Sequence, residues 1–312
     1  MDKYKKSMDR VTMKISYLKT SVLLPTLMAS MILGTTHYSF ATKAPMPDLL
    51  SNLPKELQAE IEKYKERKYI KASDLTQDNV DGYKKYDTLG LDLDRSDDET
   101  MKLVSRLTNL QAISVRATSG SGWGITDNVL KYLKDLKNLK SIVLTRSRIT
   151  DAGLEDLKDL ANLEFINLND TDITDAGLAR LKNLTNLKKI FLRGAKVSDA
   201  GLASLENLKK LEFIDLCGTR ITDAGLVSIQ NLRNLKYIDL SYNGSITDAG
   251  LASLENLKKL EFINLSTTGM TDAGLARLKN LTNLKKIIVA HKVTQPGEEE
   301  FRKSLPKVII GR

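Results

Sequence analysis

A six-residue motif recurs along the second half of the chain at a nearly constant interval. ITDAGL begins at Ile149, Ile173, Ile221 and Ile246, and its variants VSDAGL and MTDAGL begin at Val197 and Met270. Successive copies lie 24, 24, 24, 25 and 24 residues apart, and a looser copy, ITDNVL, begins at Ile125. A fixed period of this length is typical of repeat architectures, in which each unit packs mainly against its neighbours. The spacing therefore predicts a stack of similar units.

The apolar residues within one repeat predict a short helix followed by a short strand. In the repeat that begins at Ile149, the apolar positions are Ile149, Leu154, Leu157, Leu160, Leu163, Ile166 and Leu168. Intervals of three residues place leucines on one face of a helix or turn, and the final interval of two is strand alternation. A lone unit cannot bury all of these side chains, so seven or eight copies must stack to form one leucine core.

The polar and small residues of the motif also have structural interpretations. Thr150 or Asp151 can cap the helix, because a short side-chain oxygen accepts hydrogen bonds from the free amides of the first turn. Gly153 and Ala152 keep this turn thin, and Thr171 is placed to hydrogen-bond the backbone after the strand. The motif aspartates recur without the dense carboxylate clustering of a calcium loop, which favours helix capping over metal binding.

The repeated pattern Leu-x-x-Leu-x-Leu-x-x-Thr-x-Ile-Thr-Asp-Ala-Gly-Leu resembles the leucine-rich repeat family. It is similar to the subtype found in F-box/leucine-rich-repeat proteins and in secreted bacterial leucine-rich-repeat proteins, and it covers residues from about 90 to 312. The resemblance implies an α/β solenoid that is curved, with parallel strands on the concave face and short helices on the convex face. It also implies protein recognition, without naming a partner.

Three segments are predicted along the chain. These are a signal peptide over 1–41, a helical N-terminal cap segment over 42–88 and the solenoid over 89–312. Residues 46–68 have the apolar spacing of an amphipathic helix, while residues 293–312 form a modified repeat in which acidic residues replace apolar ones. Such caps are expected because the outermost leucines of a solenoid would otherwise meet water.

The first 41 residues have the organisation of a secretory signal peptide. Residues 1–20 contain six basic and two acidic side chains, and the uncharged, mostly apolar run from Ser21 to Gly34 follows. Ser39 and Ala41 supply the small residues of a cleavage site, and a run of this length is too short to span a bilayer comfortably. We expect a secreted or periplasmic protein cleaved after Ala41, with no stable membrane insertion afterwards. Anchoring by the uncleaved segment and delivery into a host cell are the alternatives.

Composition limits the chemistry of the chain. Its single cysteine excludes an intramolecular disulfide and a cysteine-based zinc site, and two histidines leave little room for acid–base catalysis. Removal of residues 1–41 lowers the formal net charge from +9 to about +5, because that segment contributes six basic and two acidic residues. This charge is too small to indicate nucleic-acid binding. We expect no enzymatic activity, no cofactor and no metal site.

Aromatic side chains gather at outward positions of the predicted strands. The residues that flank the strand leucines point out of the concave sheet, where neighbouring strands lie about 4.8 Å apart. Phe213, Tyr237 and Phe262 should therefore form a ladder roughly 10 Å long. The predicted partner-binding residues are Phe165, Lys189, Phe191, Arg193, Phe213, Asp215, Tyr237, Asp239 and Phe262.

The aromatic ladder has more than one interpretation. Water-facing aromatics with a charged rim are typical of protein docking sites, whereas a cross-strand stack can simply stiffen the sheet. Binding of a glycan or anionic polymer is a further alternative, and it predicts a steep salt dependence of affinity. The basic residues for that alternative are Lys188, Lys189, Arg193, Lys285 and Lys286.

One short stretch before the repeats is similar to the start of an F-box. Residues 53–61 read LPKELQAEI, and Leu-Pro-x-Glu-Leu begins the F-box helix that docks a ubiquitin-ligase adaptor. The resemblance implies that Leu53, Pro54 and Ile61 would contact the adaptor of a ligase in a host cell. The sequence departs from the pattern at Lys65, where a leucine is expected, and it lacks the later tryptophan.

Overall fold

The structure of the chain is a computed structural model that describes residues 68–312 apart from 72–74, 85–87, 94–97 and 118–124. The described residues form two compact units, 68–187 and 188–312. The predicted signal peptide, the amphipathic segment before residue 68 and the F-box-like residues Leu53, Pro54 and Ile61 lie outside the described residues.

The first unit contains a parallel sheet in which each strand pairs with the next along the chain. Its strands are β1 (Lys68–Lys71), β2 (Thr88–Leu93), β3 (Ala112–Ala117), β4 (Ser141–Val143) and β5 (Phe165–Asn167). Its helices are α5 (Val80–Tyr83), α6 (Asp98–Val104), η2 (Asp127–Tyr132), α7 (Asp151–Leu154), η3 (Glu155–Leu157) and α8 (Asp175–Arg180).

The second unit continues the same alternation of strand and short helix, again with parallel pairing between successive strands. Its strands are β6 (Lys189–Phe191), β7 (Phe213–Asp215), β8 (Tyr237–Asp239), β9 (Phe262–Asn264), β10 (Lys286–Ile288) and β11 (Ile309–Gly311). Its helices are α9 (Asp199–Leu202), η4 (Ala203–Leu205), α10 (Asp223–Leu226), η5 (Val227–Ile229), η6 (Gly250–Leu254), α11 (Asp272–Arg277), η7 (Leu278–Asn280) and α12 (Gln295–Ser304).

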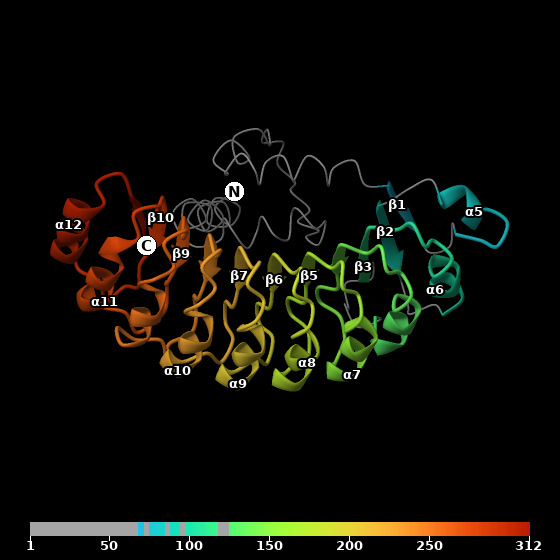
Figure 1. The fold of residues 1–312 in the computed structure, drawn as a ribbon, viewed down its shortest axis with the longest axis horizontal. Helices are drawn as coiled ribbons and strands as arrows, with labels where there is room; N and C mark the ends of the chain where they lie inside the picture. The colour runs from blue at the N-terminus through green and yellow to red at the C-terminus, as the bar shows by residue number, and fades with distance from the viewer. Residues whose placement is uncertain (1–67, 72–74, 85–87, 94–97, 118–124) are drawn as a thin grey trace, which may run out of the picture. The chain divides into compact units, whose positions relative to one another are not determined.

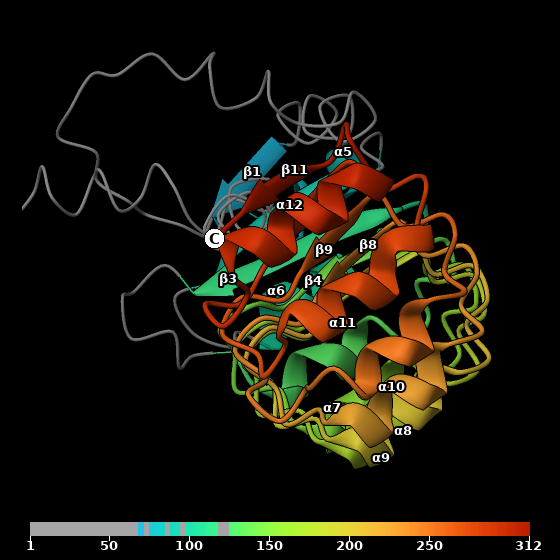
Figure 2. The ribbon, with the colours of Figure 1, turned by 90° about the vertical axis from the view of Figure 1, so that its left-hand side faces the viewer.

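Within each unit the strands form one layer and the short helices form the opposite layer (Figure 1). Figure 2 shows α11 and α12 as successive members of the helical layer, and these two helices pack against each other. The predicted fold class is confirmed: the chain is an α/β repeat fold of parallel strands and short helices.

The predicted core positions are confirmed as well. In the repeat that begins at Ile149, all seven predicted apolar side chains, from Ile149 to Leu168, have no exposed surface. They lie between the strand layer and the helix layer, so the leucine spacing read from the sequence is the spacing of the core.

The two candidate helix caps of the motif have different roles. Thr150 caps α7, since its hydroxyl oxygen accepts a hydrogen bond from the amide of Ala152 at 3.3 Å. Asp151 instead accepts two hydrogen bonds from Thr174 of the next repeat, from the amide at 2.8 Å and from the hydroxyl at 2.5 Å. The motif aspartate therefore ties one repeat to the following one and does not cap its own helix.

Glycine in the motif allows this tie to form. A Cβ atom on Gly153 would lie 2.4 Å from Oδ1 of Asp127, the motif aspartate of the preceding repeat. The prediction that Gly153 keeps the turn thin for close stacking is confirmed. The hydroxyl of Thr171 donates to the carbonyl oxygen of Leu168 at 2.7 Å, as predicted for the turn after the strand.

The start of the repeats differs from the prediction. The segment 42–88 was expected to be a helical cap, but β1 lies inside it and pairs in parallel with β2, with Lys68 opposite Leu89. Leu75 and Val80 between these strands are buried, as apolar residues are in the later repeats. The strand was missed because KYIK is short and begins and ends with lysine, which conceals its alternation.

Candidate functional site

Four aromatic rings on the strand layer of the second unit form a continuous stack. The ring centroids of Phe213 and Tyr237 lie 4.0 Å apart and those of Tyr237 and Phe262 lie 4.4 Å apart, with interplanar angles of 6° and 3°. Phe191 extends the stack beside Phe213 at 4.5 Å and 29°. The strand register places Phe213, Tyr237 and Phe262 directly opposite one another on β7, β8 and β9. The ladder predicted from the sequence is therefore present.

The exposure of these rings differs from the prediction. Phe191 and Phe213 are buried, at 5% and 9% exposure, whereas Tyr237 and Phe262 are half-buried. Stacking explains the burial of Phe213, because this ring lies between Phe191 and Tyr237 and both of its faces are covered. Phe165 lies on β5 in the first unit and is buried at 6% exposure. The accessible part of the predicted aromatic site is therefore Tyr237 and Phe262.

The hydroxyl of Tyr237 is neutral throughout the physiological pH range. Burial raises the pKa of Tyr237 well above its ordinary value of 10.0, and the carboxylates of Asp239 and Asp215 raise it further. A neutral phenol is both a hydrogen-bond donor and an acceptor. Tyr237 thus adds one polar group to an otherwise apolar stack.

The predicted acidic rim is not exposed. Asp215 and Asp239 retain 1% and 0% of their surface, so the expectation that they line an open charged edge is wrong. Each Oδ1 accepts a hydrogen bond from the amide two residues later, at 3.0 Å from Cys217 and at 2.9 Å from Ser241. Asp239 Oδ2 also accepts from Asn264 Nδ2 at 2.9 Å. These carboxylates hold the turns that follow β7 and β8.

Burial also changes the titration of Asp239. Desolvation raises the pKa of its carboxyl above the ordinary value of 3.8, while hydrogen bonds from Ser241 and Asn264 and the charge of Arg193 act in the opposite direction. A buried carboxylate that is already hydrogen-bonded within the chain has little capacity left to bind a partner. Asp239 is therefore a structural residue of the strand layer.

Basic residues flank the aromatic stack on the same register. Lys189 on β6 lies opposite Phe213, and Lys286 on β10 lies opposite Phe262; both lysines are half-buried. Arg193, also half-buried, follows β6. Lys285, one of the cations considered for binding an anionic polymer, forms an ion pair with Glu261 at 2.6 Å. In the strand register, a lysine therefore lies at each end of the row formed by Phe213, Tyr237 and Phe262.

Cys217 lies two residues after the end of β7. The side chain is buried, and desolvation raises the pKa of its thiol to about 11. A thiol with such a pKa is protonated near neutral pH and is a poor nucleophile. Within the described ranges, no three His, Cys, Asp or Glu side chains are grouped so as to hold a metal ion. None of the helices in the described part of the chain has the length and apolar character needed to cross a bilayer.

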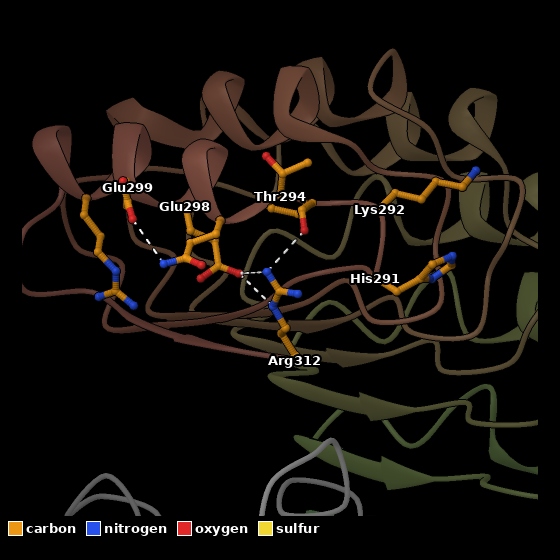
Figure 3. Close-up of a pocket in the computed structure, with 9 residues that line it drawn as sticks. His291, Lys292, Thr294, Glu298, Glu299 and Arg312 are labelled. Carbon is orange, nitrogen blue, oxygen red and sulfur yellow. Dashed lines mark hydrogen bonds and ion pairs between the residues drawn. The ribbon is translucent and has the colours of Figure 1, made fainter.

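A hollow of about 680 Å³ lies beside the N-terminal end of α12 (Figure 3). Its lining was not predicted from the sequence, because it combines residues from the turn between β10 and α12, from α12 itself and from the end of the chain. Arg312 spans part of it, pairing with Glu298 at 2.7 Å and donating to the carbonyl oxygen of Val293 at 3.3 Å. His291 and Lys292 point away from this pair in Figure 3. The charged groups therefore do not converge on a common point.

Family models match two stretches of the chain. A model described as "Leucine rich repeat" matches residues 209–270, and one described as "Leucine Rich repeat" matches residues 160–182. Residues 160–182 and 209–270 are leucine-rich repeats. The second stretch contains β7, β8 and β9, so the half-buried Tyr237 and Phe262 lie on leucine-rich-repeat strands.

Two solved structures align with the chain. The crystal structure of internalin C2 from Listeria monocytogenes aligns with a TM-score of 0.52 at 21% sequence identity, over 66% of this chain and 82% of that chain. An internalin from the same organism, inlF, aligns with a TM-score of 0.41 at 16% identity, over 73% of this chain and 80% of that chain. No curated protein sequence matches the chain. The likeness to internalin C2 supports the leucine-rich-repeat fold and is limited to it.

Proposed function

We propose that the chain is a non-enzymatic protein-binding module whose partner docks on the strand layer of residues 188–312. The observation that carries this proposal is the pair of half-buried, stacked rings of Tyr237 and Phe262. Aromatic side chains held rigidly on a sheet lose little conformational entropy on binding, and they are enriched among the residues that dominate interface affinity. The stack fixes both rings before a partner arrives.

The surroundings of these two rings also favour a docking role for the strand layer. The predicted acidic residues beside them are hydrogen-bonded within the chain, and the buried rings of Phe191 and Phe213 extend the stack on the side of Tyr237. A partner therefore meets the edges of the two half-buried rings and the flanking lysines. Ring edges have positive partial charge, so they favour side-on contact with aromatic faces or oxygen atoms.

Substitution of the two accessible rings tests this proposal. The partner is first captured by crosslinking in native extract and identified by mass spectrometry, and its affinity is then measured with the purified chain. Tyr237→Ala and Phe262→Ala should each weaken binding about 30-fold, the loss expected on truncating an aromatic residue at the centre of an interface. Val227→Ala, which truncates an exposed apolar residue on η5 in the helix layer, is the matched control.

The affinity of the variants decides the proposal only if they remain folded. The core leucines are untouched by these changes, and each lost ring contact is worth about 1 kcal/mol, so a folded state is expected. Circular dichroism and thermal melting check this. If both variants are folded and bind the partner with wild-type affinity, the partner does not dock on the strand layer.

We also propose that the protein is secreted after cleavage behind Ala41. The support is the order of a basic segment, an uncharged apolar run and the small residues Ser39 and Ala41. N-terminal sequencing of the protein recovered from its native source tests this. A mature terminus at residue 42 is expected, while an intact N-terminus in the membrane fraction would favour the anchored alternative.

A further inference from the structure

One cation beside the aromatic stack has no counter-charge. Lys286 follows Phe262 in the strand register and is half-buried, and no carboxylate among the described residues forms an ion pair with it. A half-buried lysine can pack its aliphatic stem along apolar neighbours while its ammonium group stays near the surface. Among the described residues, Lys286 therefore places an unpaired positive charge at the end of the aromatic row.

In the neighbouring row of the same sheet, basic and acidic side chains form ion pairs. The residues that precede each strand are Lys188, Glu212, Lys236, Glu261 and Lys285. In this row Lys236 pairs with Glu212 at 2.8 Å and Lys285 pairs with Glu261 at 2.6 Å. Each of these acids is already bonded to a lysine of its own row, so neither is free to neutralise Lys286.

The row that contains Lys286 holds no acidic residue. Its members on β6 to β10 are Lys189, Phe213, Tyr237, Phe262 and Lys286. The nearest acids on the next outward row, Asp215 and Asp239, are buried and hydrogen-bonded to the turns after their strands. Within the described residues, the positive charge at this end of the aromatic row is therefore uncompensated.

We infer that the partner presents an aromatic or aliphatic side chain to Tyr237 and Phe262 together with a carboxylate that pairs with Lys286. This inference rests on the proposed function and specifies the chemistry of the partner. The ring and the carboxylate must be separated by about one strand spacing, roughly 5 Å, because Phe262 and Lys286 occupy neighbouring strands. The positive edges of the rings add to the attraction for carboxylate oxygens.

Two small probes that differ only in charge test this inference on the full chain. N-acetylphenylalanine carries a benzyl ring beside a carboxylate, and N-acetylphenylalaninamide carries the same ring beside a neutral amide. Their affinities are measured at pH 7 by ligand-observed saturation-transfer NMR. The carboxylate should bind about fivefold more tightly, as expected for one charge-assisted contact at a partly exposed site.

Variants of one position locate the effect. Lys286→Gln should abolish the difference between the probes, and Lys286→Arg should preserve it. Lys279→Gln removes the same charge from an exposed position on η7 and should leave the preference unchanged. Equal binding of both probes to the wild-type chain, or an unchanged preference in Lys286→Gln, overturns the inference.

A third variant separates failure of the inference from failure of the proposed function. If both probes bind equally but Tyr237→Ala weakens both, the aromatic docking site stands and the acidic partner does not. If Tyr237→Ala leaves the binding of both probes unchanged, the aromatic site itself is wrong. Absence of binding by either probe overturns the inference and also counts against the proposed docking site.

Discussion

The helix layer and the strand layer of the second unit differ in how strictly they repeat. On the helix side, each motif aspartate accepts two hydrogen bonds from a threonine of the next repeat, at 2.6–2.8 Å in four successive copies. The four aspartates are Asp199, Asp223, Asp248 and Asp272. On the strand side, the row that contains Tyr237 has lysine, phenylalanine, tyrosine, phenylalanine and lysine at equivalent positions.

This difference indicates which layer determines the stability of the fold and which layer is available for recognition. The hydrogen bonds between aspartate and threonine, together with the motif glycine, fix the distance between repeats. Substitution of any of these residues therefore disturbs the contacts between the two repeats that they join. Side chains on the strand layer face away from the leucine core, so they can differ from repeat to repeat without changing the stacking. We therefore expect large stability effects on the helix side and large binding effects on the strand side.

The largest stability effect is expected at the motif glycine. A Cβ atom on Gly225 would lie 2.2 Å from Oδ1 and 3.2 Å from the backbone Cα of Asp199. Gly225→Val must therefore push two repeats apart or break the tie between Asp199 and Thr222, at a cost of about 3 kcal/mol. Urea unfolding followed by circular dichroism measures this loss.

A second glycine provides the control for this change. A Cβ atom on Gly244 meets no atom within 4 Å, so Gly244→Ala should change the free energy of unfolding by less than about 0.5 kcal/mol. The contrast between the two layers would break down if Gly225→Val were as mild as Gly244→Ala, or if Tyr237→Ala were more destabilising than Gly225→Val.

A smaller loss is expected on removing the aspartate itself. Asp223 accepts from the amide of Thr247 at 2.7 Å and from its hydroxyl at 2.6 Å, and Asp223→Ala removes both acceptors. The expected loss is about 2 kcal/mol, measured by the same unfolding assay. The affinity for the partner should be unchanged, since this residue lies in the helix layer.

A double-mutant cycle with Thr247→Val isolates the side-chain contact between the two repeats. The hydroxyl bond exists only when both residues are present, so the two single losses should exceed the loss in the double variant by about 1 kcal/mol. Strictly additive losses would show that the aspartate acts through the backbone amide alone.

The fold could be predicted from the sequence because the repeat spacing reports the core directly. The positions from Ile149 to Leu168 are buried as their spacing predicts, and Thr171 makes its expected turn contact. The role of the motif aspartate could not be predicted, because Asp151 meets a residue 23 positions later and no local pattern reveals that contact. β1 was missed because its short, lysine-flanked sequence has no copy of the motif.

The candidate site was only partly predictable. Register follows from the repeat, so the alignment of Phe213, Tyr237 and Phe262 could be read in advance. Exposure could not, because it depends on how closely the rings stack. Asp215 and Asp239 were expected on an open rim because their side chains are charged. The amides two residues later draw both carboxylates into the turns instead.

A small effect is expected in the turn that follows each strand. Thr267 has a φ of 55°, and the equivalent turn positions Gly194 and Gly218 have φ values of 67° and 64°. A left-handed conformation suits glycine and is costly for a β-branched residue, so the repeat geometry imposes this φ regardless of the side chain. Thr267→Gly should therefore stabilise the chain by about 0.5 kcal/mol, while Gly218→Ala should destabilise it by about 1 kcal/mol. A loss of stability in Thr267→Gly would mean that the Thr267 side chain stabilises the turn. The strand side would then contribute to the stacking of the repeats, contrary to the contrast between the two layers.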